Sequence, residues 1–187
     1  MDYELFKAIN GLAGRSHALD ALMVAIATYS PVIYALALLA LWLTWRRVNQ
    51  RGALIAGISA LIALGLGQIV GAVFPRQRPY LAHHVTQLIS HSVDTSFPSD
   101  HTTMAFAVTA GVFAFNRRAG VLLFVLGVVL AFARVFVGAH YPGDVLGGAV
   151  LGALTALGTT RLTASGRIAR LIDGLFGLLR RLRVAAP

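Results

Sequence analysis

The sequence predicts an all-α protein, a polytopic membrane helix bundle of about six transmembrane helices, and two observations support this. Of the 187 residues, 57% are hydrophobic and only 12% are charged, which is more apolar surface than one soluble core of this size can bury. The apolar residues also gather into separate segments along the chain. The longest of these reach the roughly 20 residues that a helix needs to cross a bilayer.

The N-terminal residues predict two short helices. Over residues 2–12, apolar side chains recur at helical spacing with polar residues between them, which indicates an interfacial helix that is too short to span. A second helix is expected at 17–28, after Ser16 as its N-cap, and it is short for a span. The charged residues near the start do not fit a signal peptide, so the N-terminus is expected to be retained.

Longer apolar segments complete the predicted bundle. Ser30 and Pro31 are the residue types of an N-cap and a first helical position, so a span is expected at 31–45. The span at 52–74 contains several glycines, which permit close contact with other helices. After a polar loop at 75–100, three more spans are predicted, at residues 101–115, 119–137 and 144–160.

The sequence after the last predicted span is both basic and apolar. Residues 161–183 hold six arginines among leucine, isoleucine and phenylalanine residues. This predicts an amphipathic helix on an anionic membrane leaflet, with a solvated tail as the alternative. We therefore divide the chain into a transmembrane domain at 1–163, with its motif core at 52–160, and a basic cytoplasmic tail at 164–187.

The basic residues predict the orientation in a bacterial plasma membrane. Thirteen of the 16 lysines and arginines fall on one side of the predicted bundle, which is then cytoplasmic, as are both termini. The net charge of +9 is thus explained by topology and not by a nucleic-acid partner. On the opposite side lie three arginines and five histidines: Arg76, Arg78, Arg134, His83, His84, His91, His101 and His140. Exceptions to a topology rule that gather in one place indicate a functional site.

Three short segments at this outer face supply groups suited to a phosphoryl ligand. They are residues 75–79, 97–101 and 134–144. Arg78 and Arg134 carry forked donors that match phosphate oxygens. The helix that follows the second segment presents free N–H groups and the positive end of its dipole, which together favour an anion.

Two histidines in these segments can act as a nucleophile and an acid. His140 is followed four residues later by Asp144. If this carboxylate accepts from one ring nitrogen, the other nitrogen is free to attack phosphorus. His101, at the mouth of its helix, can protonate the departing oxygen.

Taken singly, these residues also have simpler interpretations. Ser99 or Asp100 can be only a helix cap, and Arg134 can be an anchor whose head group reaches the interface. The loop histidines His83, His84 and His91 are expected to be solvated. The spacing of Asp94 and Asp100 does not favour a divalent ion, so no metal or other cofactor is predicted. The joint occurrence of the three segments is more specific than any one of them.

The segments resemble the three-part signature of the type 2 phosphatidic acid phosphatase family: Lys-x6-Arg-Pro, Pro-Ser-Gly-His, and Ser-Arg-x5-His-x3-Asp. The matching residues are 78–79, 98–101 and 133–144. The resemblance implies that His140 is the nucleophile, His101 the acid and Asp144 the orienting carboxylate, in an enzyme that needs no metal. It implies that the phosphate is bound by Arg78, Ser99 and Arg134.

The chain departs from this signature at three positions. Gly71 takes the place of the lysine, Asp100 that of the glycine and Ala133 that of the serine. The stretch Ser-Phe-Pro-Ser-Asp-His resembles the bacitracin-resistance branch, the undecaprenyl-diphosphate phosphatases. Asp100 is therefore placed in the phosphate-binding set. Arg76 is predicted to join it and replace the charge of the missing lysine, the alternative being a surface charge that meets lipid head groups.

The expected function is hydrolysis of undecaprenyl diphosphate to undecaprenyl phosphate at the outer face of the membrane, through a phosphohistidine. The expected partners are this polyprenyl lipid and the surrounding membrane lipids. One alternative is a phosphatase of phosphatidylglycerol phosphate, phosphatidic acid or another lipid monophosphate. A non-enzymatic transporter or permease is a second alternative, which predicts charged or broken helices at mid-bilayer.

Overall fold

The computed structural model describes residues 1–90, 94–164, 166–182 and 184–186, and within them it contains helices and no strands. His91 and Arg183, on which predictions fell, lie outside the described residues. The predicted all-α class is confirmed. The helices are α1 (Asp2–Asn10), α2 (His17–Leu43), α3 (Arg47–Val73), α4 (Pro79–Ala82), α5 (Asp100–Phe113), α6 (Arg117–Phe136), α7 (Pro142–Thr163) and α8 (Gly166–Arg181).

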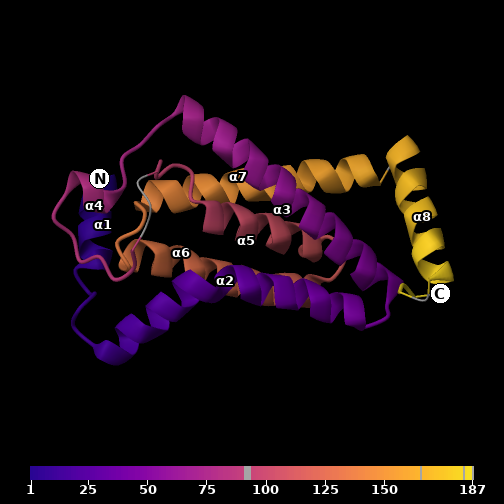
Figure 1. Cartoon of the computed structure of the whole chain (residues 1–187), viewed down its shortest axis with the longest axis horizontal. Helices are drawn as coiled ribbons and strands as arrows, with labels where there is room; N and C mark the ends of the chain where they lie inside the picture. Colours follow the sequence, from indigo (N-terminus) through magenta and orange to yellow (C-terminus); the bar gives the residue numbers. More distant parts are fainter. Residues whose placement is uncertain (91–93, 165, 183, 187) are drawn as a thin grey trace.

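Four of these helices, α2, α3, α6 and α7, are long and apolar enough to cross a membrane. The shorter α5 lies among them and packs most extensively against α7 and α3 (Figure 1). The predicted count of six spans is not reached in the described residues. The helices expected at 17–28 and 31–45 form the single helix α2, and α5, which was predicted to span, has only 14 residues.

Pro31 lies inside α2 without ending it. A proline has no backbone N–H, so the carbonyl four residues earlier loses its helical partner. That carbonyl belongs to Ala27, and it accepts a hydrogen bond from Nη1 of Arg134 at 3.4 Å. Neighbouring helices commonly satisfy such freed groups within a bundle. The proline that suggested a helix start is therefore accommodated by a contact from α6.

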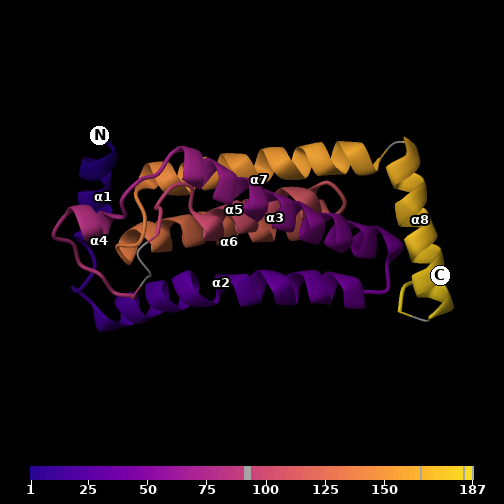
Figure 2. The ribbon, with the colours of Figure 1, turned by 45° about the horizontal axis from the view of Figure 1, so that its top comes forward.

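The termini lie at opposite ends of the bundle (Figures 1 and 2). The N-terminus and α1 are at one end with α4, and α8 lies across the other end. A membrane crossed along the length of this bundle would lie between the two termini, which disagrees with the prediction that both face the cytoplasm. The reason is that α2 is a single helix. The chain therefore crosses the length of the bundle once between α1 and α3, whereas the prediction had two crossings there. Lys7 and Arg15 accordingly move to the end that holds α1.

Small residues set the distance between α5 and α7. A Cβ atom on Gly152 would overlap the carbonyl oxygen of Thr103, and one on Gly148 would overlap the hydroxyl of Thr102. Only glycine permits this approach, which brings the start of α7 directly against the first turns of α5.

The amphipathic helix predicted in the tail corresponds to α8. Its Phe176 and Ile172 are buried against the end of the bundle, beside Trp42 and Leu54. Leu171, Leu175 and Leu178 are exposed and lie among arginines in the sequence. This pattern suits a helix that lies in the plane of a membrane surface.

Candidate active site

The three segments singled out in the sequence meet at the end of the bundle that holds α1 and α4 (Figure 1). Nη1 of Arg78, from the first segment, donates to the carbonyl oxygen of Ala139 in the third at 3.1 Å. The backbone N–H of Ser99, from the second segment, donates to the carbonyl oxygen of Asp144 at 3.1 Å. Backbone and side-chain bonds thus hold all three together.

His140 is placed between the other two segments and is 2% exposed. Its Nδ1 lies 2.9 Å from the carbonyl oxygen of Ser96. A carbonyl can only accept, so Nδ1 carries the proton and Nε2 keeps its lone pair. Nη1 of Arg78 donates to Nε2 at 3.1 Å. The unprotonated nitrogen of the predicted nucleophile therefore faces a cation that can bind phosphate.

The orienting group of His140 differs from the one that the sequence suggested. Oδ2 of Asp144 is 3.8 Å from Nδ1, which is too far for a hydrogen bond. The Ser96 carbonyl makes that bond instead. Asp144 acts one step further out, because its Oδ2 accepts from the hydroxyl of Ser96 at 2.5 Å and from the backbone N–H of Tyr141 at 2.9 Å.

Burial lowers the pKa of His140 to about 4. The positive charges of Arg134 and Arg78 act in the same direction, and Asp144 acts against them. A buried imidazole with cations beside it is more stable without its own charge. His140 is therefore neutral at physiological pH, which is the form in which a nitrogen can attack phosphorus.

The predicted phosphate ligands Arg78, Arg134 and Ser99 lie at the same end of the bundle as this histidine. Arg78 is buried, and its Nε donates to Asp94 at 2.6 Å. Arg134 is buried in the last turn of α6. Ser99 is the N-cap residue of α5, yet its hydroxyl makes no cap bond and no hydrogen bond among the described residues. A simple cap therefore does not account for this buried hydroxyl, which suits a phosphate oxygen.

The remaining predicted residues have other neighbours. His101 is partly buried in the first turn of α5. The carboxylate of Asp100 accepts from Nε2 of Gln68 at 3.2 and 3.3 Å. Arg76 donates from Nη1 to Asp144 at 2.8 Å and from Nη2 to Asp2 at 2.6 Å. Contact of these three with phosphate stays a prediction, and for Arg76 both terminal nitrogens already serve carboxylates.

Comparison with known proteins assigns this site to a family. Residues 52–167, more than half of the chain, match the PAP2 superfamily. The chain belongs to the PAP2 superfamily. This confirms the resemblance of the three segments.

Two PAP2 relatives and one solved structure show how far the likeness extends. Undecaprenyl-diphosphatase BcrC of Bacillus subtilis is 44% identical over 151 residues, which cover 81% of this chain and 78% of the relative. Bacitracin transport permease protein BcrC of Bacillus licheniformis is 35% identical over 158 residues, which cover 84% and 78%. The crystal structure of Aquifex aeolicus LpxE superposes with a TM-score of 0.73 at 23% identity, covering 86% of this chain and 94% of that one. The last likeness concerns the fold alone.

The packing around Gly71 explains why this PAP2 chain lacks the signature lysine there. A Cβ atom on Gly71 would lie 2.8 Å from Cγ2 of Thr95 and 3.0 Å from the carbonyl oxygen of Phe97. The loop before α5 thus fills the space that a side chain at this position would need. A lysine would push this loop away from the helix.

Sequence reasoning missed two residues of the PAP2 site, Ser96 and Asp2. Ser96 contributes mainly a carbonyl oxygen, which any residue carries, so no side-chain pattern identifies it. Its place directly before the second segment was the one available signal. Asp2 reaches the site from α1, which the sequence had placed on the opposite side of the membrane.

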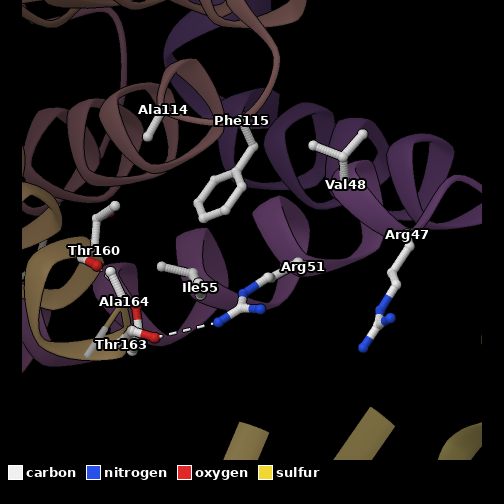
Figure 3. A pocket seen from close by; sticks show the side chains of 9 residues that line it. All are labelled: Arg47, Val48, Arg51, Ile55, Ala114, Phe115, Thr160, Thr163 and Ala164. Carbon is white, nitrogen blue, oxygen red and sulfur yellow. Dashed lines mark hydrogen bonds between the residues drawn. The ribbon is translucent and has the colours of Figure 1, made fainter. Parts of the chain in front are cut away.

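Two cavities help to locate the substrate. One of about 430 Å³ is apolar, lies between α3 and α7, and begins at Phe97 and Pro98, next to Ser99. The other, of about 530 Å³, lies at the far end of the bundle, where Arg51 donates to the Thr163 carbonyl at 3.3 Å (Figure 3). The far cavity is lined by none of the predicted site residues.

Proposed function

We propose that this protein hydrolyses undecaprenyl diphosphate to undecaprenyl phosphate and inorganic phosphate, through a phosphohistidine at His140. Membership of the PAP2 superfamily and the similarity to an undecaprenyl-diphosphatase support a lipid phosphatase. The observation that carries the finer proposal is the tautomer of His140: Nδ1 is bonded to a carbonyl, and Nε2 faces Arg78.

The reaction needs two displacements at phosphorus. In the first, Nε2 of His140 forms a bond to the terminal phosphorus, and the bond from that phosphorus to the bridging oxygen breaks. Undecaprenyl phosphate leaves, with His101 as the proton donor. In the second, water attacks the phosphohistidine and releases phosphate, and His101 takes up the proton. Arg78, Arg134 and the first turn of α5 would stabilise the charge on the phosphoryl oxygens.

The lipid part of the substrate has a matching surface. The apolar cavity beside Pro98 is lined by side chains such as Val70, Leu146 and Val150. Pro98 in its lining directly precedes Ser99, whose hydroxyl has no hydrogen bond among the described residues, so a diphosphate at the site would extend its isoprenoid tail between α3 and α7. A relative named undecaprenyl-diphosphatase, at 44% identity, supports the same substrate.

Phosphate release would test the activity. Purified protein in detergent is given undecaprenyl diphosphate, farnesyl diphosphate, phosphatidic acid and phosphatidylglycerol phosphate, each with and without a chelator. We expect the diphosphates to turn over fastest and the chelator to have no effect. His140→Ala should lose activity and the acid-labile label that wild type traps from radioactive substrate. A faster reaction with the lipid monophosphates would favour the alternative substrates, and no phosphate release from any of them would refute the assignment.

The distribution of charge supports an extracytoplasmic site. The far end of the bundle carries at least eight described arginines and a single described acidic residue, Asp173. These arginines are Arg46, Arg47, Arg51, Arg117, Arg118, Arg161, Arg170 and Arg181. The site end carries five cations among six acidic residues. By the positive-inside rule the far end faces the cytoplasm.

Thiol labelling would test this orientation, since the chain has no cysteine. Gln87 lies in the loop near α1, and Ala164 lies after α7 at the far end; both are exposed. Gln87→Cys should react with an impermeant reagent added outside intact cells, and Ala164→Cys should react only after lysis. The reverse pattern would place the site in the cytoplasm.

A further inference from the structure

The N-terminal helix is fastened to the active-site end by contacts that do not involve its first residues. Nδ2 of Asn10 donates to the carbonyl oxygens of Phe136 and Thr86, both at 2.8 Å, and its Oδ1 accepts from the N–H of Thr86 at 3.0 Å. Phe6 is buried against Tyr141 and its neighbours. These contacts would keep α1 docked when the residues before Phe6 are changed.

The carboxylate of Asp2 joins α7 to the first site segment. Its Oδ1 accepts from the backbone N–H of Gly143 at 2.8 Å. That N–H lies in the first turn of α7, where a helix provides no partner of its own. Its Oδ2 accepts from Nη2 of Arg76 at 2.6 Å. Asp2 therefore holds Arg76 at a fixed place relative to the start of α7.

Arg76 passes this constraint on to the buried carboxylate. Its Nη1 donates to Oδ1 of Asp144 at 2.8 Å, and its guanidinium carbon lies 4.0 Å from the centre of the Tyr141 ring. A planar guanidinium serves two carboxylates from two nitrogens held in fixed directions, whereas a lysine ammonium donates from a single nitrogen on a flexible stem. Asp144 is 0% exposed, so water does not replace a donor that is lost there.

We propose that Asp2 is a positioning residue for His140 and that it acts through Arg76 and Asp144. This inference rests on the proposed phosphohistidine reaction. Asp144 accepts from the hydroxyl of Ser96, and the carbonyl of Ser96 fixes Nδ1 of His140. The hydrogen-bonded chain from α1 to the nucleophile is therefore continuous. Without the charge of Asp2, the guanidinium of Arg76 loses one of the two carboxylates that fix it and can shift, and Asp144 and Ser96 lose their fixed geometry.

Steady-state kinetics on farnesyl diphosphate would test the proposal. Asp2→Asn keeps the size of the side chain and the acceptor for Gly143 but removes the charge that binds Arg76. We expect kcat to fall about tenfold with KM changed less than about twofold, because the lost geometry matters in the transition state. Asp2→Glu, which keeps the charge, should recover most of kcat.

A double variant would show whether Asp2 acts through Arg76. Arg76→Lys keeps a charge but loses the fixed pair of nitrogens that joins the two carboxylates, so kcat should fall by at least as much as in Asp2→Asn. The combination of the two should be no slower than Arg76→Lys alone, since residues that act through one contact are not additive. Fully multiplied losses would show that Asp2 acts by another route and would overturn the proposal.

Glu4→Gln provides the matched control. Glu4 lies on the same helix and carries the same charge, but it pairs with Lys7 at 2.9 Å on an exposed face. The kcat of the Glu4→Gln variant should therefore equal that of wild type.

Rates are compared only for protein that elutes as a single species and melts near the wild-type temperature. An Asp2→Asn enzyme with wild-type kcat overturns this inference alone. A wild type inactive on every lipid phosphate would refute the proposed function instead.

Discussion

The buried, neutral His140 should make the stability of the protein depend on pH in a defined window. Its pKa falls from 6.5 to about 4 on folding, which corresponds to about 3 kcal/mol at 1.36 kcal/mol per unit. Between these two values the unfolded chain binds a proton at this residue and the folded chain does not. The free energy of unfolding is therefore unaffected by this residue above pH 6.5, and it falls by about 3 kcal/mol as the pH drops from 6.5 to 4.

Thermal denaturation of wild type and His140→Gln in detergent, from pH 4 to 7, would measure this effect. Gln does not titrate, so the difference between the two melting temperatures isolates His140 from other groups. We expect wild type to lose its advantage as the pH falls, by several degrees, at about 2–4 °C per kcal/mol for a chain of this size. Because membrane proteins often unfold irreversibly, both are scanned at one rate. Parallel curves would show that His140 titrates near 6.5 in the folded protein and would refute the argument.

Three further substitutions test the site. Ser96→Ala removes the hydroxyl bonded to Asp144 but keeps the carbonyl that binds His140. We expect kcat to fall by the equivalent of about 1.5–3 kcal/mol, the range for hydrogen bonds to charged groups. KM should change little. Gly71→Lys should destabilise the protein by about 1–3 kcal/mol through overpacking against the loop before α5, seen as a lower melting temperature. His101→Ala should slow a lipid monophosphate more than a diphosphate, because a phosphate leaving group has a pKa of about 6 and needs less help from an acid than an alkoxide.

Hydropathy was sufficient to predict α3, α6 and α7, because each is a long apolar segment bounded by loops. It failed at α2, where Ser30 and Pro31 look like a helix start. The proline is tolerated there because Arg134, 107 residues away in sequence, bonds the freed carbonyl of Ala27. The residue pattern of one helix does not show that a side chain from a distant helix will bond its free carbonyl. The error in α2 then displaced α1 to the wrong end of the bundle.

The candidate site was predictable where side-chain chemistry defines it. The spacing of His140 and Asp144, and the arginines near them, mark the site in the sequence. The spacing could not show which acceptor fixes the ring, because the Ser96 carbonyl has no signature of its own. It also could not show that Asp2, 74 residues before Arg76, supplies a carboxylate to it. Both omissions concern contacts made by the tertiary fold.

The partners of Arg76 and Arg78 separate two arginines that the sequence treats as a pair. Arg78 bonds Asp94, a carboxylate that is 49% exposed and that regains water when it is displaced. It also faces Nε2 of His140. Arg76 bonds the fully buried Asp144, and displacing that carboxylate would leave a charge without solvent, at a cost of several kcal/mol. An incoming phosphate therefore exchanges most easily with Asp94 on Arg78, while Arg76 stays with the framework that orients the nucleophile.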